Sequence, residues 1–192
     1  MTTETQLNFA DQYRSELHAT IDMIDTAKVQ QAIAWMNEAR LAERHIFICG
    51  NGGSAATSSH FVVDMIKGAS GKVDPRFRIM ALTDQIPTMT AYANDVHYES
   101  IFLEPLRNFA KPGDVVIGVS GSGNSPNVWK AVDYANGAGC KTIALTGCDG
   151  GKLASLGQLN IHINSSHMGR IEDAHMIICH MICYSFMDNI KR

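Results

Sequence analysis

Two pairs of ionisable side chains are spaced so that each pair can face one site from a predicted helix. His60 and Asp64 are four residues apart, and Glu172 and His180 are eight residues apart. At about 3.6 residues per turn, both spacings bring the two side chains toward the same side of a helix. Two imidazoles and two carboxylates form a ligand set that suits zinc. If the two pairs face one site, His60, Asp64, Glu172 and His180 would together make a plausible zinc set.

Ordinary helix chemistry also accounts for each of these residues. An Asp four residues after a His is often a simple helix pair. Glu172 and Asp173 could instead cap the last helix near its positive end. We interpret His175, in the same segment, as a packing residue or as support for the ligands. The residues alone leave a metal site and a purely structural role both open.

A glycine-rich turn, GNGGS, follows the apolar run HIFIC (residues 45–49) and leads into a predicted helix. Its glycines allow close backbone approach to a ligand. Ser54 is predicted to cap the helix, whose free N–H groups would face an anion. The turn lacks both the GxGxxG spacing of dinucleotide sites and the Lys-Ser/Thr of a Walker loop. We expect Gly52, Gly53 and Ser54 to line a phosphate site.

A second turn of the same design, SGSGNSPN, follows the run DVVIGV (residues 114–119). It offers hydroxyl and backbone donors without Lys or Arg, which suits a phosphate monoester at a helix N-terminus. Pro126 is placed where a first helical residue is expected. A flexible serine-glycine connection is the alternative. We predict that the second turn contributes Ser120, Gly121, Ser122 and Ser125 to the phosphate site.

The elements that must position these residues alternate along the chain. Five short apolar runs cover residues 45–49, 78–82, 114–119, 141–145 and 159–163, and the predicted helices cover 54–67, 86–94, 99–109, 126–137, 150–156 and 169–190. Apolar runs separated by helices are typical of a parallel sheet buried on both faces. We predict an α/β fold, a three-layer αβα doubly wound sandwich with a five-stranded parallel sheet. Both glycine-rich turns then lie at carboxyl ends of strands, where ligands bind in such sheets.

Two further helices are predicted before the first strand. Apolar residues recur at helical spacing from about residue 6 to 42, with a break near Asp25 and Thr26. An apolar face on helices outside the α/β repeat favours packing against another subunit. Packing against the chain's own core is the alternative.

The composition argues against nucleic-acid-binding, membrane-spanning and secreted proteins. A net charge of −3 and a pI near 6.2 leave no basic field for nucleic acid. No apolar run reaches the length of a membrane span, and the polar first residues do not predict a signal peptide. The five cysteines form no CxxC motif, so we interpret them, Cys179 and Cys183 included, as reduced core residues of a cytoplasmic protein.

Five motifs together resemble the sugar isomerase (SIS) domain family, and more narrowly its phosphoheptose isomerase branch. They are GNGGS, a His six residues after its Ser, VSGSGNS, LTG-x-DGG (145–151) and the stretch RIEDAHMIICH (170–180). The resemblance implies one SIS domain over residues 1–192, with helices of residues 1–42 contributing to a homotetramer. It implies interconversion of sedoheptulose 7-phosphate and D-glycero-D-manno-heptose 7-phosphate. It also implies one zinc ion per site, with ligands at the positions of His60, Asp64, Glu172 and His180. It further implies that Asn51, Asn94 and Asp95 contact sugar hydroxyls, although a place in a loop or helix cap accounts equally well for Asn94 and Asp95.

This chain departs from the family's pattern at two of the predicted ligands. Position 64 usually carries Glu and position 172 usually carries Gln, whereas this chain has Asp64 and Glu172. Aldose–ketose isomerisation needs a base at carbon and an acid at oxygen. We predict that Glu172 or Asp64 moves the carbon proton and His180 the oxygen proton, while zinc polarises the carbonyl.

Two functions of other classes stay open on the sequence. Some relatives in this branch are non-catalytic tetramers that bind a replication initiator, and other SIS modules sense sugar phosphates without turnover. The presence of His60, Asp64, Glu172 and His180 together favours an enzyme.

Overall fold

A computed structural model describes residues 3–188 of the chain. All five predicted strands are present, as β1 (His45–Gly50), β2 (Arg78–Ala81), β3 (Val115–Ser120), β4 (Lys141–Thr146) and β5 (Leu159–His162). They form one sheet in the order β2-β1-β3-β4-β5, with every neighbouring pair parallel.

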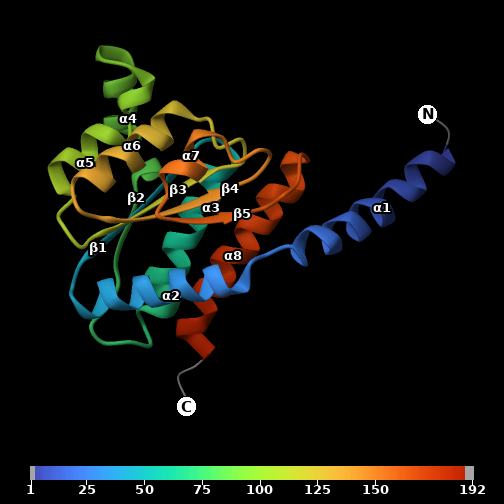
Figure 1. Cartoon of the computed structure of the whole chain (residues 1–192), viewed down its shortest axis with the longest axis horizontal. Coiled ribbons are helices and arrows are strands. Elements are labelled where there is room, and N and C mark those ends of the chain that lie inside the picture. Colours follow the sequence, from blue (N-terminus) through green and yellow to red (C-terminus); the bar gives the residue numbers. More distant parts are fainter. Residues whose placement is uncertain (1–2, 189–192) are drawn as a thin grey trace.

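Helices cover both faces of this sheet (Figure 1). On one face α2 (Thr26–Leu41), α3 (Gly53–Val63) and α8 (Met168–Asp188) pack over Ile46 and Ile48 of β1. On the other face α5 (Leu103–Phe109), α6 (Pro126–Gly137) and α7 (Gly151–Leu156) pack over Phe47 and Cys49. Successive residues of a strand point to opposite faces, so one short run serves two cores. The predicted doubly wound sandwich is confirmed.

The strand order fixes where a ligand can bind. β1 and β3 are neighbours in the sheet, but the chain leaves β1 for α3 on one face and leaves β3 for α6 on the other. Such a reversal opens a crevice at the carboxyl ends of the two strands. Both predicted phosphate turns, which follow Gly50 and Ser120, border this crevice.

The two N-terminal helices have different surroundings. The predicted break is confirmed, because Asp25 caps α2 by accepting hydrogen bonds from the N–H groups of Ala27 and Lys28. α2 buries Val29 and Met36 in the chain's own core. In contrast, α1 (Thr3–Ile21) projects from the body (Figure 1).

Two side chains of α1 fasten it to the beginning of α8. The Tyr13 hydroxyl donates to Asp173 Oδ2 at 2.6 Å, which raises the pKa of Tyr13. Glu16 forms an ion pair with Arg170. The remaining exposed surface of α1 includes Phe9, which is 63% accessible. α2 exposes Leu41 at its end (58% accessible), so both helices keep apolar surface for another subunit.

Two of the predicted helices are irregular in the structure. The helix predicted over 99–109 is divided into η3 (Tyr98–Ser100) and α5. Pro105 lacks an N–H and is tolerated only in the first turn of a helix, so α5 begins at Leu103. α3 continues as a π-helix, η1 (Asp64–Ala69), that begins at a predicted metal ligand. Irregular turns of this kind are frequent at functional sites.

The short elements that follow β2 differ in burial. η2 (Leu82–Asp84) buries Leu82 and Thr83, whereas α4 (Ile86–Asp95), into which it leads, buries none of its side chains.

No helix within residues 3–188 is long and apolar enough to cross a membrane.

The cysteines lie mostly in the core, as predicted. All five are free, and only Cys148 is partly exposed. Burial raises the pKa of Cys49 and of Cys179 to about 12, so these thiols stay protonated near neutral pH.

Candidate active site

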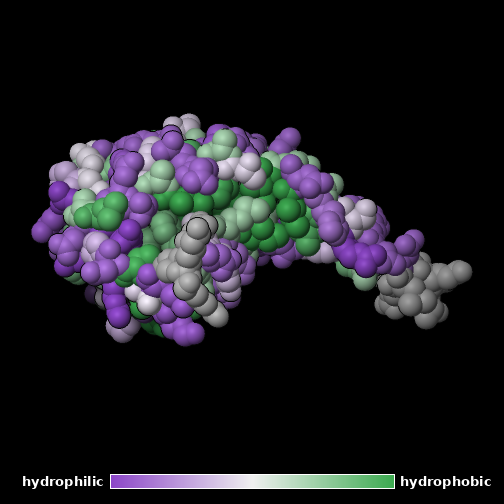
Figure 2. Space-filling view, turned by 90° about the horizontal axis from the view of Figure 1, so that it is seen from below, coloured by the Kyte–Doolittle hydropathy of each residue, from purple (hydrophilic) through white to green (hydrophobic). Residues whose placement is uncertain are grey.

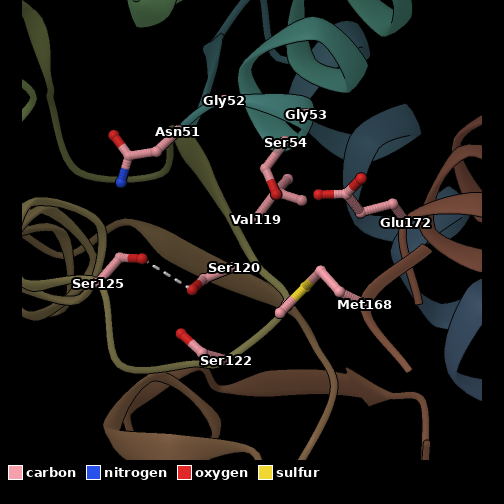
Figure 3. Close-up of a pocket in the computed structure, with 11 residues that line it drawn as sticks. Asn51, Gly52, Gly53, Ser54, Val119, Ser120, Ser122, Ser125, Met168 and Glu172 are labelled. Carbon is pink, nitrogen blue, oxygen red and sulfur yellow. Dashed lines mark hydrogen bonds between the residues drawn. The ribbon is translucent and has the colours of Figure 1, made fainter. Parts of the chain in front are cut away.

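A pocket of about 300 Å³ lies in the crevice between β1 and β3. We call it the phosphate pocket, and Figure 3 shows its side chains converging from three directions. Nine of the predicted site residues line it, and Val119 and Met168 are lining residues that the sequence did not identify. The predicted nine are Asn51, Gly52, Gly53, Ser54, Ser120, Gly121, Ser122, Ser125 and Glu172.

The helix that follows the first turn is capped by a different residue from the one predicted. Gly52, not Ser54, is the N-cap of α3, with a φ of 53° that favours glycine. Ser54 is already inside the helix, and its side chain makes no capping hydrogen bond. The prediction that Ser54 caps the helix was therefore wrong. Because no side chain caps this end, the first N–H groups of α3 are left for a ligand.

The second turn is held by its own hydroxyls. Ser120 Oγ lies 3.1 Å from Ser125 Oγ and also accepts from the Gly123 N–H at 3.1 Å. Pro126 is the first residue of α6, as predicted. These bonds fix the orientation of two of the three serines that this turn contributes to the pocket.

A third turn supports the second from outside. Gly123 O accepts from the Leu153 N–H at 2.9 Å, and Asn124 Oδ1 accepts from the Lys152 N–H at 3.2 Å. Both donors belong to α7, which follows the LTG-x-DGG stretch. The serine-glycine turn is thus anchored, and the alternative of a flexible connection does not describe it.

The amide of Asn51 is tied to two residues that the sequence analysis missed. Asn51 and Asn127 exchange side-chain hydrogen bonds of 2.8 Å each, and the Tyr98 hydroxyl donates to Asn51 Oδ1 at 3.0 Å. Asn127 belongs to α6, in the same sequence stretch as the serines, which is the only local signal for it. Its partner lies 76 residues away, so the contact depends on the sheet order.

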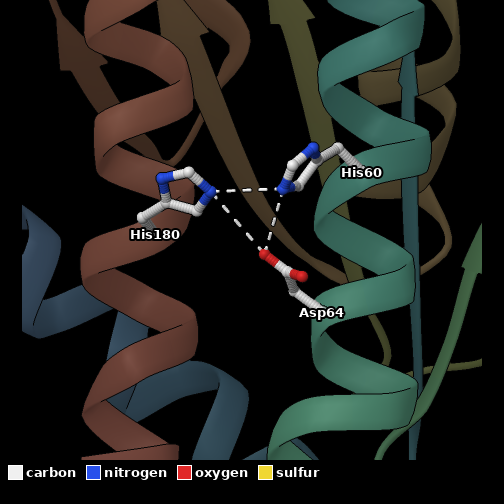
Figure 4. A group of neighbouring side chains, drawn as sticks. All are labelled: His60, Asp64 and His180. Atoms are coloured by element: carbon white, nitrogen blue, oxygen red, sulfur yellow. Dashed lines mark hydrogen bonds and ion pairs between the residues drawn. The ribbon is translucent and has the colours of Figure 1, made fainter.

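His60, Asp64 and His180 form a second group, which we call the histidine cluster (Figure 4). His60 Nε2 lies 3.2 Å from His180 Nε2 and 3.2 Å from Asp64 Oδ2, and His180 Nε2 lies 3.6 Å from Asp64 Oδ2. Ligands about 2.0–2.1 Å from a tetrahedral zinc ion are separated by about 3.4 Å. The three donor atoms therefore fit one zinc ion and leave a fourth position open.

Two helices that lie side by side build the histidine cluster. His60 and Asp64 come from α3 and the start of η1, and His180 comes from α8 (Figure 4). Gly53 near the start of α3 faces Glu172 near the start of α8. Since residues 53 and 60 face residues 172 and 180 respectively, the two helices run in the same direction. All three side chains are partly exposed, by 28–47%, so small molecules can reach them.

Glu172 is the predicted ligand that the structure places elsewhere. It lines the phosphate pocket, and a Cβ on Gly53 would meet its Oε1 and Oε2 at 2.6 and 2.7 Å. The separation of eight positions between Glu172 and His180 corresponds to roughly 12 Å along α8. Three of the four predicted ligands are brought together, while Glu172 as a ligand stays a prediction.

Asn94 and Asp95 lie outside the residues that line the phosphate pocket. They are exposed at the end of α4, where Asn94 Nδ2 donates to Asp95 Oδ1 at 2.7 Å. Since neither residue lines the pocket of its own chain, their predicted contact with sugar hydroxyls stays a prediction.

His175 connects α8 to the end of β4. Its side chain is 1% exposed, and its Nε2 lies 3.2 Å from the Thr146 carbonyl oxygen, which leaves Nδ1 without a partner. Burial lowers the pKa of His175 to about 4, so the ring is neutral near neutral pH. This placement agrees with the packing interpretation. The alternative that Glu172 and Asp173 cap the last helix does not hold, because α8 begins at Met168 and has no acidic residue in its first turn. Asp173 accepts a hydrogen bond from the Tyr13 hydroxyl, and Glu172 lines the pocket.

Known proteins resemble both the sequence and the structure. The family model of the SIS domain matches residues 8–147. A probable phosphoheptose isomerase of Thermoplasma volcanium is 45% identical over 138 residues, 72% of this chain and 70% of that protein. One from Thermoplasma acidophilum is 37% identical, covering 88% of this chain and 90% of its own. The solved phosphoheptose isomerase GmhA from Neisseria gonorrhoeae superposes with a TM-score of 0.87 at 29% identity, covering 96% of this chain and 98% of its own.

Proposed function

The chain belongs to the SIS domain family and to its phosphoheptose isomerase branch, and from this we propose how its two groups of residues serve one isomerisation. The reaction interconverts an aldose and a ketose phosphate, sedoheptulose 7-phosphate and D-glycero-D-manno-heptose 7-phosphate. The phosphate pocket holds the phosphoryl end of the sugar. The histidine cluster serves its carbonyl end.

The separation of the two groups along α8 is the observation that carries this proposal. Glu172 lines the phosphate pocket, and His180 belongs to the histidine cluster. The rise of the helix separates their backbones by roughly 12 Å, and both side chains are long enough to narrow this gap. A sugar phosphate whose phosphoryl group lies on the serine turn, across the pocket from Glu172, would therefore place its carbonyl end between Glu172 and the cluster.

We place the phosphoryl group on the second turn. Ser120, Ser122 and Ser125 offer hydroxyls there, and the turn is anchored by Gly123. The carboxylate of Glu172 lies next to Gly53 at the start of α3. A second negative charge beside Gly53 would be repelled, so the hydroxyl side of the pocket is favoured.

His60, Asp64 and His180 would hold the zinc ion, since the distances between their donor atoms fit its coordination. When bound, zinc supplies a positive charge that stabilises the enediolate oxygen. Asp64 in place of the family's usual Glu still brings its Oδ2 to 3.2 Å from His60 Nε2. The Asp64 side chain, although shorter than Glu, is thus long enough to bring its carboxylate to the two histidines.

Glu172 is our choice for the base that moves the carbon proton. Its carboxylate faces the pocket, whereas the Asp64 carboxylate points into the cluster, where it would bind the metal. His180 Nε2 also points into the cluster. With Nε2 on the metal, Nδ1 is the nitrogen of His180 left to move the oxygen proton.

We also propose that the chain acts as a cytoplasmic homotetramer. Apolar side chains gather on the lower face of the body and continue toward the base of α1 (Figure 2). Val63 and Ile66 beside the histidine cluster are at least half exposed. Apolar surface of this kind marks contacts between subunits. Light scattering coupled to gel filtration would measure the subunit number.

The central test combines turnover with metal content. Purified protein is incubated with sedoheptulose 7-phosphate in D₂O, and NMR follows product formation and deuterium exchange at the carbon next to the carbonyl. Proton transfer by Glu172 predicts exchange, which Glu172→Ala abolishes and Glu172→Gln does not restore. Zinc is measured in the same samples by mass spectrometry.

The possible results test the zinc assignment, the base and the reaction separately. Turnover without bound metal would contradict the zinc assignment and leave the isomerase intact. Full exchange in Glu172→Ala would transfer the base role to another group. Ligand binding without turnover in the zinc-loaded protein would contradict the proposed reaction.

A further inference from the structure

The reciprocal amide pair between Asn51 and Asn127 joins the two turns that border the phosphate pocket. Asn51 follows β1 directly, and Asn127 is the second residue of α6. Each Nδ2 donates to the Oδ1 of the other residue at 2.8 Å. Asn127 is 1% exposed, so water does not compete for these bonds. The pair therefore fixes the orientation of both amides.

All the accepting capacity of Asn51 is used within the protein. Its Oδ1 accepts from Asn127 Nδ2 and, at 3.0 Å, from the Tyr98 hydroxyl. A carbonyl oxygen has two lone pairs, and an amide nitrogen has two hydrogens. One hydrogen of Asn51 Nδ2 goes to Asn127. The second N–H is the group that the Asn51 side chain can offer to the pocket that it lines.

We propose that Asn127, assisted by Tyr98, is a positioning residue that holds Asn51 as a hydrogen-bond donor toward the phosphoryl group. An unrestrained amide can rotate about χ2 and turn its oxygen toward the ligand, where it would repel phosphoryl oxygens. The amide pair prevents Asn51 from turning alone, and the Tyr98 hydroxyl that donates to Oδ1 leaves the nitrogen as the atom facing the pocket. Asn51 then matches the other donors of the pocket, the hydroxyls of Ser120 and Ser125.

This inference rests on the proposed function, because it assumes that a phosphoryl group enters the pocket. It also revises the role predicted for Asn51. A sugar hydroxyl can both donate and accept, whereas an ionised phosphoryl group accepts from donors. A side chain restricted to donation fits the phosphoryl group better than a sugar hydroxyl.

The test uses Asn127→Leu, which keeps the approximate shape of the side chain and adds no charge. Isothermal titration calorimetry measures the Kd of inorganic phosphate, and steady-state kinetics measure kcat and KM for sedoheptulose 7-phosphate. We expect the Kd of phosphate and the KM to rise together by about tenfold or more, as for the loss of an oriented hydrogen bond to a charged group. We expect kcat to change much less, because the contact is made in both ground and transition states.

Two further variants separate positioning from general damage to the fold. Asn136→Leu makes the same change at the far end of α6, where Asn136 bonds to Thr142 and Gln158. It should lower the Tm without changing the Kd of phosphate. Tyr98→Phe removes one hydroxyl from a residue that is 56% exposed, and the protein should fold normally. It should raise the Kd of phosphate by about two- to fivefold, since one restraint on Asn51 is lost.

The outcomes distinguish this inference from the function on which it rests. Folded Asn127→Leu and Tyr98→Phe proteins that bind phosphate as the unchanged chain does would overturn the positioning role. An equal loss of phosphate binding in Asn136→Leu would overturn it too, because the effect would then be general. If the unchanged chain binds phosphate but does not isomerise sedoheptulose 7-phosphate, the proposed reaction fails, and the phosphate titrations still decide the role of Asn127.

Discussion

The phosphate pocket and the histidine cluster both use residues of α3 and α8, yet they are built in opposite ways. In the pocket, side chains are held by other protein groups, as Ser120 is by Ser125 and Asn51 is by Asn127. In the cluster, the donor atoms of His60, Asp64 and His180 contact one another. The pocket is therefore formed before the ligand arrives. The cluster gathers electron-donating atoms that a cation would draw together.

This difference predicts that each region can be damaged without the other. A pocket held by protein hydrogen bonds should bind phosphate whether or not metal is present. The cluster should lose its chemistry when one ligand is removed, while phosphate binding persists. Four changes test this separation.

Removing a metal ligand should have the largest effect. His60→Ala or His180→Ala should lower kcat/KM at least about 10³-fold, because a metal acting as a Lewis acid contributes several kcal/mol. Zinc content should fall in parallel, and the Kd of inorganic phosphate should stay within about twofold of the original. His18→Ala, at the exposed end of α1, is the control. A comparable loss of phosphate binding would show that the two regions are not separable.

Acidification tests the part of α8 that joins the two regions. The folded pKa of His175 is about 4, below the ordinary value of 6.5. Between these values the unfolded chain binds the proton and the folded chain does not, so stability falls as the pH decreases from 6.5 to 4. The full loss is about 3 kcal/mol, and it is absent above pH 6.5.

His175→Gln keeps an N–H donor near Thr146 and removes the titrating ring. Urea unfolding at several pH values should show a flatter profile for this variant than for the original chain. Equal slopes between pH 4 and 6.5 would contradict the assignment to His175.

Gly53→Ala tests the contact at which the pocket approaches the cluster. The new Cβ would lie 2.6 Å from Glu172 Oε1, so the carboxylate must move. The end of a Glu side chain moves easily, and we expect a stability change below about 1 kcal/mol. Displacement of the base by about 1 Å should nevertheless lower kcat/KM by about tenfold to a hundredfold.

Gly137→Ala is the matched control, because a Cβ there meets no neighbouring atom. Its kinetics should equal those of the original chain. Unchanged activity in Gly53→Ala would argue against Glu172 as the base.

Ser125→Ala should give the smallest effect. Loss of one hydroxyl donor raises KM and the Kd of phosphate by about five- to tenfold, with kcat nearly unchanged. Ser155→Ala removes a hydroxyl that bonds to Lys152 O on the exposed side of α7, and it should change neither constant. A larger fall in kcat than in affinity for Ser125→Ala would place this serine near the reacting carbons.

Local sequence was sufficient for the strands and for the turns. The five apolar runs became β1 to β5 within one residue of their predicted ends. The two turns that border the phosphate pocket carry glycine where φ is positive, at Gly52 and Gly123. Such choices are made within a few residues, so they can be recognised from the chain alone. Spacing along one helix also predicted that His60 and Asp64 would share a site.

Packing decided what the sequence left open. Ser54 is inside α3 because the backbone of Gly52 starts the helix earlier. Glu172 and His180 share a helix, but their positions along it send one to the pocket and the other to the cluster. The pairs Asn51–Asn127 and His60–His180 join residues 76 and 120 positions apart. Contacts over such distances follow from the strand order and from the packing of α3 against α8, which no local pattern specifies.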